Sequence, residues 1–222
     1  MVERTHLSAI ILAGGESRRM GSDKAFLEHE GRSFVDSIVA EMSKVADDVV
    51  VMVGKKSGGS FASAVGERAR VFQDDNYLAN PLGGVLSGFS HVKHSKTAVV
   101  ACDSPLVKAE VIGFLAAALQ EHSAAVPLWE EDDKMTMEPL CAVYDVKEAK
   151  KAALTTIKEN AMTMKKMVFH LADVLYVGVA QLRLVDSELV SLVNVNTREE
   201  YDALERREDS SEFLYPGAER SQ

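Results

Sequence analysis

Cysteine is scarce in this chain of 222 residues, because only Cys102 and Cys141 occur. Their number and spacing fit neither a disulfide framework nor a zinc-binding motif, and a reducing compartment is the simplest one. No apolar run approaches the roughly eighteen residues that a membrane-spanning helix needs. The opening "MVERTHL" lacks the apolar region of a secretory signal. We therefore expect a cytoplasmic protein.

An excess of basic residues is also missing, since 25 Lys and Arg face 34 Asp and Glu, for a net charge of −9. An acidic surface repels nucleic acid and anionic membranes, so we expect neither as a partner. Hydrophobic residues make up 46% of the chain, which is enough for a sizeable core. We expect a single domain over residues 1–204, followed by a charged, loose tail over residues 205–222.

The common phosphate-binding motifs are absent as well. A Walker A loop has a lysine directly after its last glycine, but Gly21 is followed by Ser22 and Asp23 before Lys24. The glycines also do not follow the G-x-G-x-x-G spacing of a dinucleotide-binding turn. Neither type of loop is therefore predicted.

A different glycine loop follows the first apolar run, "SAIILA" at 8–13. Gly14 and Gly15 allow a tight turn that brings backbone N–H groups close to a ligand. Arg18, Arg19 and Lys24 add positive charge around this turn, against the acidic balance of the chain. We interpret the loop as a phosphate-binding site; the alternative is that the three cations are solvated surface charges.

Apolar runs typical of buried strands alternate with amphipathic segments typical of helices. The strand candidates are residues 8–13, 47–53, 96–102 and 123–128, and the clearest helix candidates are residues 34–45 and 110–122. This alternation predicts an α/β fold, a three-layer Rossmann-like sandwich with a mostly parallel sheet. Residues 132–145 suggest a hairpin or an irregular excursion from that sheet, followed by two helices separated by a break near Asn160.

Ligands of parallel sheets bind at the carboxyl ends of the strands, which directs attention to Asp103. Asp103 follows the run "TAVVA", and Pro105 comes two residues later. A carboxylate at this place could hold Mg²⁺ against nucleotide phosphates, or it could cap a helix. A third candidate segment, "VFQDDNYLANPLGGVLSGF" at 71–89, places Asp74 after a short strand and Pro81 near a helix start. Its alternative interpretation is a turn followed by a tightly packed helix.

The segment "LAGGESRRMGSDK", from Leu12 to Lys24, closely resembles the signature of molybdenum cofactor guanylyltransferases within the nucleotidyltransferase superfamily. Weaker similarity continues in the same order over residues 7–203. The resemblance implies that Asp103 binds Mg²⁺ and is catalytic together with Lys24, Arg18 and Arg19. It also implies a nucleotide site that comprises Leu12, Ala13, Gly14, Gly15, Gly21, Lys24, Asp74, Pro81, Leu82, Gly83, Gly84 and Asp103.

The same resemblance implies a second substrate site for the pterin. Its candidate residues are Glu138, Pro139, Lys165, Lys166, Asn194 and Asn196. The two lysines could equally form a solvated helix face, and the two asparagines could be turn residues before a helix capped by Thr197 and Glu200. Two positions depart from the family pattern, because Glu138 replaces a usual His or Gln and Gly54 replaces a frequent Asn.

The implied reaction is transfer of GMP from GTP to the terminal phosphate of molybdopterin, with release of pyrophosphate. GTP and molybdopterin would be the substrates, Mg²⁺ the cofactor, and molybdopterin-synthesis proteins or acceptor molybdenum or tungsten enzymes the candidate partners. One alternative is a related nucleotidyltransferase that uses CTP on molybdopterin or activates a sugar phosphate. A more distant alternative is a non-catalytic protein that binds a nucleotide or molybdopterin, because a fold by itself does not specify a reaction.

Overall fold

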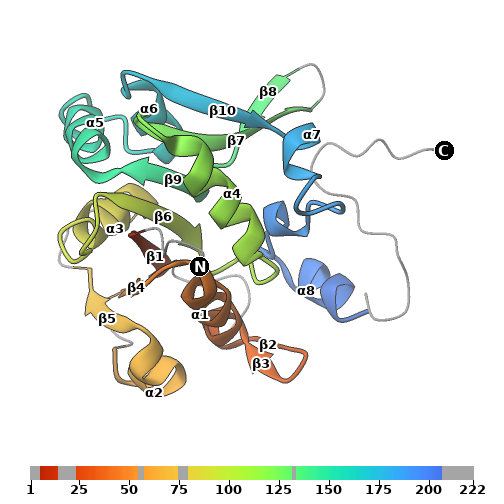
Figure 1. The fold of residues 1–222 in the computed structure, drawn as a ribbon. Helices are drawn as coiled ribbons and strands as arrows, with labels where there is room; N and C mark the ends of the chain where they lie inside the picture. The colour runs from red at the N-terminus through yellow and green to blue at the C-terminus, as the bar shows by residue number, and fades with distance from the viewer. Residues whose placement is uncertain (1–5, 15–23, 55–57, 75–79, 132–133, 207–222) are drawn as a thin grey trace.

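A computed structural model describes residues 6–14, 24–54, 58–74, 80–131 and 134–206 (Figure 1). In this part of the chain, a twisted eight-stranded sheet has the order β10-β7-β9-β6-β1-β4-β5, with β8 paired to β7. The strands are β1 (Leu7–Ala13), β4 (Asp48–Val53), β5 (Arg70–Gln73), β6 (Lys96–Ala101), β7 (Ala124–Glu131), β8 (Lys134–Met137), β9 (Cys141–Asp145) and β10 (Val174–Gly178). The predicted α/β fold with a mostly parallel sheet is confirmed.

One strand runs against the others in the middle of the sheet. β9 lies between β6 and β7 and pairs antiparallel with both. The prediction that residues 132–145 leave the main sheet is therefore wrong for the second half of the segment. The β7–β8 hairpin reverses the chain, and Cys141–Asp145 then returns as a buried central strand. The sequence signal for this return was the apolar run "CAVY", which was too short to show which strands it would pair with.

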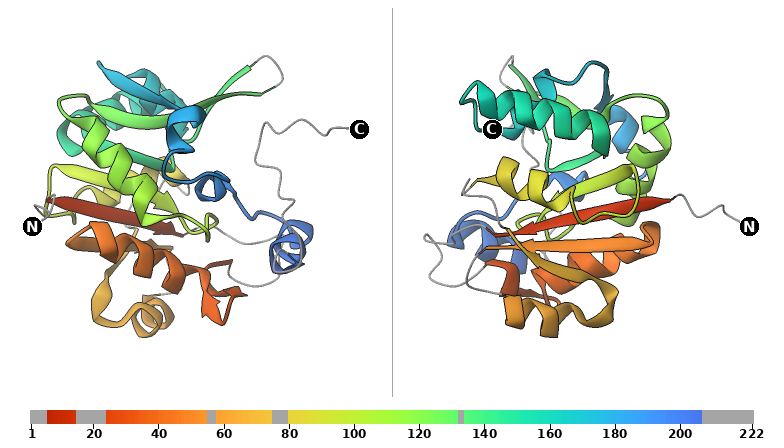
Figure 2. Two further views of the ribbon diagram at one scale, coloured as in Figure 1. Left: turned by 45° about the vertical axis from the view of Figure 1, so that its right-hand side comes forward. Right: turned by 90° about the vertical axis from the view of Figure 1, so that its left-hand side faces the viewer.

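Helices cover both faces of the sheet, as the two views in Figure 2 show. The helices are α1 (Phe34–Val45), α2 (Gly58–Val65), α3 (Pro81–Gly88), α4 (Ala109–Leu119), α5 (Val146–Lys158), α6 (Met164–Phe169), α7 (Val179–Leu182) and α8 (Arg198–Glu205). Helices α1, α2, α4 and α7 pack on one face, and α3, α5 and α6 pack on the other. A small hairpin of β2 (Glu28–His29) and β3 (Arg32–Ser33) precedes α1.

Strand β1 shows how the sequence builds this three-layer arrangement. Successive side chains of a strand point to opposite faces of the sheet. Accordingly, Leu7, Ala9, Ile11 and Ala13 belong to the core under α1 and α4, whereas Ile10 packs in the core under α3 and α5. All these residues are buried, so the strand is apolar on both faces apart from Ser8, which is buried as well.

Several predicted boundaries agree with the structure. Helix α1 spans the predicted residues 34–45, and the Ser33 side chain accepts a hydrogen bond from the Asp36 N–H at its start. The break between α5 and α6 includes Asn160, whose φ of 57° ends the first helix. Thr197 and Glu200 form the predicted capping box of α8. Helix α8 ends at Glu205, and the remainder of the predicted tail, from residue 207, lies outside the described residues.

In the parts of the chain that the structure describes, no helix has the length and apolar character needed to cross a membrane.

Candidate active site

Four chain segments leave the sheet at the carboxyl ends of neighbouring parallel strands. Gly14 follows β1, Gly54 follows β4, Asp74 follows β5, and Asp103 follows β6. Backbone hydrogen bonds continue the sheet into these segments, because the N–H of Cys102 donates to the carbonyl of Leu12 at 3.0 Å and that of Asp74 donates to Val53 at 2.8 Å. The sheet therefore brings the predicted residues of three separate motifs to one edge.

The two glycines at this edge lie close together. A Cβ atom added to Gly14 would lie 3.1 Å from the Gly54 nitrogen, and one added to Gly54 would lie 3.1 Å from the Gly14 oxygen. The atoms in the way belong to the backbone and cannot rotate aside. Gly54 thus has a structural reason to be glycine, because Gly14, directly after β1, packs against its backbone.

Asp103 lies in a turn between β6 and α4 and does not cap a helix. Lys108 is at the N-cap position of α4, five residues later. The turn is closed by a hydrogen bond from the Ser104 N–H to the Ala101 carbonyl, and the Asp103 carbonyl accepts a bond from the N–H of Val195 at 2.7 Å. The helix-cap alternative for Asp103 is therefore excluded, and the segment before α8 is bound to this turn.

Lys24 reaches the same place from the other side of the glycine loop. Its Nζ donates to Oδ1 of Asn196 at 2.9 Å. Burial raises the pKa of the Asp103 carboxyl, while the positive charge of Lys24 acts in the opposite direction and the negative charge of Glu200 raises it further. Lys24 and Asp103 are thus electrostatically coupled although 79 residues separate them in the chain (103 − 24).

A hydrogen-bonded chain of side chains connects Ser104, the residue after Asp103, with Glu138. Ser104 Oγ donates to Oδ1 of Asn194 at 2.7 Å, and Nδ2 of Asn194 donates to Oε2 of Glu138 at 3.3 Å. Burial raises the pKa of Glu138, and the neighbouring charge of Asp103 raises it as well. The side chains of Asn194 and Asn196 both bind residues of the site. They position Glu138 and Lys24 respectively, which is more than a role in a turn.

The part of the predicted nucleotide site that begins at Pro81 lies at the start of α3. Pro81 is the first residue of this helix, after Asn80, whose side chain accepts a hydrogen bond from the Gly83 N–H at 2.9 Å. Leu82 is fully buried in the core, so its side chain does not face a ligand. A Cβ atom at Gly84 would lie 3.2 Å from Leu12 and 3.8 Å from Oδ2 of Asp74. The absence of a side chain at Gly84 therefore lets α3 pack closely against the end of β1. This packing is compatible with a nucleotide site and with a turn followed by a tightly packed helix.

A pocket of about 510 Å³ opens beside Glu138. It is lined by Pro81, Trp129, Thr136, Met137, Glu138, Pro139, Leu140, Met162, Thr163, Met164 and Lys165. The pocket therefore extends from the start of α3 to the start of α6, and its wall is largely apolar. Lys165 contributes to the wall, whereas Lys166 does not, so the structure separates the two predicted lysines.

Trp129 is a pocket residue that the sequence reasoning missed. It is only 5% exposed, and its indole Nε1 has no hydrogen-bond acceptor among the described residues. A buried donor without a partner is costly unless a ligand or water satisfies it. The available signal was that Trp129 is the single tryptophan of the chain, at the end of an apolar run.

Four predicted residues of the glycine loop, namely Gly15, Arg18, Arg19 and Gly21, lie outside the described residues.

Solved structures of nucleotide-transferring enzymes share this fold. The molybdopterin-guanine dinucleotide biosynthesis protein A of Archaeoglobus fulgidus superposes with a TM-score of 0.74 at 24% identity, over 90% of this chain and 97% of that one. The 2-C-methyl-D-erythritol 4-phosphate cytidylyltransferase of Thermus thermophilus gives 0.71 at 16% identity, over 91% and 98%. At such identities the likeness concerns the fold, which is that of nucleotidyltransferases.

Sequence comparison specifies the family. The family described as "MobA-like NTP transferase domain" matches residues 9–173. Similar curated proteins include a probable molybdenum cofactor guanylyltransferase of Methanosarcina acetivorans, 34% identical over 89% of both chains. The molybdenum cofactor guanylyltransferase of Desulfosudis oleivorans is 32% identical over 90% of this chain and 94% of its own. This chain belongs to the MobA-like nucleotidyltransferase family, and it is an enzyme of that class.

Proposed function

We propose that this enzyme transfers GMP from GTP to the terminal phosphate of molybdopterin and releases pyrophosphate. The names of its curated relatives support this reaction. The structural observation that carries it is that two asparagines of one segment bind both parts of the site. Asn196 accepts a hydrogen bond from Lys24, and Asn194 connects Ser104, which is next to Asp103, with Glu138 at the pocket. A nucleotide at the glycine loop and an acceptor in the pocket would meet beside this segment.

The chemistry needs positioning and charge rather than a protein nucleophile. An oxygen of the molybdopterin phosphate, already anionic at neutral pH, attacks the α-phosphorus of GTP. A new P–O bond forms, and the bond to the β-phosphate oxygen breaks, so that pyrophosphate leaves with the electron pair. Lys24 neutralises charge that develops on the α-phosphate and the leaving group, together with Arg18 or Arg19. Backbone N–H groups of the glycine loop cradle the phosphates.

The residues at the end of β6 fit a magnesium ion. Asp103 and Glu138 are both desolvated carboxyls, and the charge of Asp103 raises the pKa of Glu138, so a cation would relieve their repulsion. Mg²⁺ binds through one or two carboxylates and keeps water and phosphate as its other ligands. Asp103 would hold the ion, which when bound supplies charge neutralisation between the phosphates. Asp74, next to Gly84 at the end of β5, would contact the nucleotide.

The pocket beside Glu138 suits the pterin half of the second substrate. Its wall is largely apolar, with residues such as Met137 and Leu140, and Lys165 lies at one end. Lys165 offers positive charge to the phosphate of the pterin substrate. We propose GTP and molybdopterin as the substrates, and molybdopterin-synthesis proteins or acceptor enzymes as partners. We place the enzyme in the cytoplasm.

Nucleotide binding and pyrophosphate release test the proposal. Calorimetry with GTP, CTP, ATP and UTP in the presence of Mg²⁺ is expected to show that the chain prefers GTP. This preference is expected to weaken in the Asp103→Asn variant. The matched control is Asp173→Asn, an exposed carboxyl that pairs with His122. Pyrophosphate release on adding molybdopterin would exclude a mere binding protein. Preference for CTP or UTP would instead assign the chain to a related nucleotidyltransferase.

The single tryptophan provides a separate test of the pterin pocket. Molybdopterin is expected to change the fluorescence of Trp129, whereas GTP alone changes it much less. Lys165→Ala is expected to raise the KM for molybdopterin by roughly tenfold, as loss of one charge-assisted contact predicts, and to leave GTP affinity unchanged. Lys166→Ala, at a lysine that does not line the pocket, is the control. An unchanged KM would contradict the assignment of this pocket to the pterin.

A further inference from the structure

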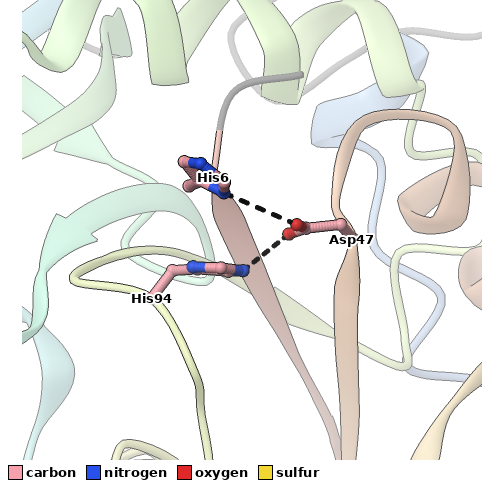
Figure 3. Close-up of side chains that lie close together, drawn as sticks. All are labelled: His6, Asp47 and His94. Carbon is pink, nitrogen blue, oxygen red and sulfur yellow. Dashed lines mark ion pairs between the residues drawn. The ribbon is translucent and has the colours of Figure 1, made fainter.

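Two histidines and an aspartate converge at the opposite edge of the sheet, far from the strand ends that carry Asp103. His6 precedes β1, Asp47 precedes β4, and His94 lies in the loop before β6. These three strands are neighbours, and their register places Asp48 beside Ser8 and Lys96 beside Leu7. The residues just before the strands are therefore brought together, and both histidine rings face the Asp47 carboxylate (Figure 3).

The distances are those of a site that can close on a metal ion. His94 Nε2 lies 2.7 Å from Oδ1 of Asp47, and His6 Nδ1 lies 3.7 Å from Oδ2. The ligand atoms of the three residues all lie within 4.8 Å of one another. Ligands of a tetrahedral zinc ion lie roughly 3.4 Å apart, given metal–ligand distances of about 2.0–2.1 Å. Within the described residues, this is the one group of three such side chains that converges so closely.

The loop that carries His94 is held rigidly by buried groups beneath the cluster. The backbone N–H groups of Lys93 and His94 donate to Ser8 Oγ at 3.2 and 3.1 Å, and the Lys93 N–H also donates to Oδ2 of Asp48 at 2.9 Å. Ser8 and Asp48 are both buried and bonded to each other. Asp47 is fixed in turn, because its N–H donates to the Leu7 carbonyl at 3.2 Å. Two of the three side chains are therefore pre-positioned.

The third side chain is free to adjust. The side chain of His6 is 82% exposed, whereas those of Asp47 and His94 are 30% and 21% exposed. A rotation of His6 closes the group without any change in the sheet. The opening toward solvent also leaves room for a water molecule as a fourth ligand, as in zinc sites with three protein ligands. Neutral imidazoles and one carboxylate suit borderline divalent ions such as Zn²⁺ better than Mg²⁺.

We propose that His6, Asp47 and His94 form a binding site for a divalent transition-metal ion of the Zn²⁺ type. The site is separate from the active site and does not depend on the proposed guanylyl transfer. A bound ion links the segments that precede three central strands, and so it stabilises the fold. Only the folded chain brings the three ligands together, so the ion binds the folded state and not the unfolded state. Its binding therefore raises the free energy of unfolding by mass action.

Co²⁺ titration of the full chain, without an affinity tag, tests the site. Tetrahedral Co²⁺ with nitrogen and oxygen ligands gives visible absorption, and Zn²⁺ is expected to displace it with a one-to-one stoichiometry. Zn²⁺ at about 100 times its Kd is expected to raise Tm by roughly 5–10 °C. His6→Gln and His94→Gln are each expected to weaken Zn²⁺ binding by at least the 10–100-fold that loss of an outer ligand partner typically costs.

Two variants serve as controls. His122→Gln removes the histidine of a His122–Asp173 pair at 2.8 Å that has no third ligand beside it among the described residues, and it is expected to leave Zn²⁺ binding unchanged. Asp103→Asn is expected to leave it unchanged as well, which separates this site from the Mg²⁺ site. The proposal is overturned if the wild-type chain binds no Zn²⁺, or if binding survives both His6→Gln and His94→Gln.

Discussion

Carboxyl groups at the two edges of the sheet, where the parallel strands begin and where they end, have pKa values shifted in opposite directions. At the amino-terminal edge, Asp48 is buried, but it accepts hydrogen bonds from Ser8, Lys93 and Arg70. Burial alone would raise the pKa of Asp48, but the bonds from Ser8, Lys93 and Arg70 outweigh burial and lower it. Its charge is therefore stabilised in the folded state.

At the carboxyl-terminal edge, burial raises the pKa of Asp103, and Lys24 offsets only part of this effect. Burial also raises the pKa of Glu138, in spite of hydrogen bonds from Leu140 and Asn194 that act in the opposite direction. The two edges therefore differ in whether the surrounding protein stabilises the charge of a buried carboxylate. Satisfied carboxylates stabilise the structure, whereas carboxylates left short of partners are available to bind a cation and phosphates.

The largest expected effect is that of Asp103→Asn, which should lower kcat by about 10³-fold or more because several kcal/mol of charge stabilisation are lost. The same change should increase the free energy of unfolding at neutral pH. A raised pKa means that the folded chain holds the proton longer, so ionised Asp103 opposes folding above the usual carboxyl range. The gain should vanish as the pH falls below that range. Urea unfolding at pH 7 and pH 4 measures the effect on stability, and turnover at pH 7 measures the effect on kcat. A variant that is less stable than the wild-type chain at pH 7 would contradict the comparison of the two edges.

Lys24→Ala should reduce kcat by roughly 10²–10³-fold, because it removes positive charge from the developing phosphate charges. Asn196 would also lose the partner that its Oδ1 accepts from. Steady-state pyrophosphate release measures the effect. Lys44→Ala, at an exposed lysine of α1 that pairs with Glu41, is the control and should retain normal turnover. Comparable rates for the two variants would remove Lys24 from the mechanism.

Asp48→Asn should affect stability and leave turnover nearly unchanged. A lowered pKa means that ionised Asp48 favours folding above the usual carboxyl range, and that this contribution is lost as the pH falls through the lower folded-state value. We expect a loss of about 1–3 kcal/mol in the free energy of unfolding at pH 7, which shrinks in acid. Urea unfolding across pH 3–7 provides the measurement. A loss that persists unchanged in acid would show that shape rather than charge matters here.

Thr197→Ala should have the smallest effect, about 1 kcal/mol of stability, because it removes one side of the capping box with Glu200. Thermal unfolding measures it. Thr155→Ala, in the exposed middle of α5, is the matched control and should change stability by less than about 0.5 kcal/mol. If the Thr197 variant also lost turnover severalfold, the cap would be needed to hold Asn196 toward Lys24.

Local patterns predicted the elements that depend on local chemistry. The apolar run before Gly14, the helix over residues 34–45 and the capping box at Thr197 are each encoded by neighbouring residues, and all are present. The position of β9 was not predictable in this way, because strand pairing depends on contacts between distant segments. Trp129 was missed for the same reason, since it lines a pocket built from α3, β7, β8 and α6, which are distant in the sequence.

The sequence was sufficient to predict the alternation of strands and helices, the glycine loop, and the residue types Lys24 and Asp103 that suit phosphate chemistry. The folded structure was needed to show that Asn196 binds Lys24, that Asn194 connects Ser104 with Glu138, that Lys165 rather than Lys166 lines the pocket, and that two histidines meet Asp47 at the far edge. The physical reason is that hydrogen bonds and charge interactions act over a few ångströms of space, and only the register of the folded sheet brings such distant residues within that range.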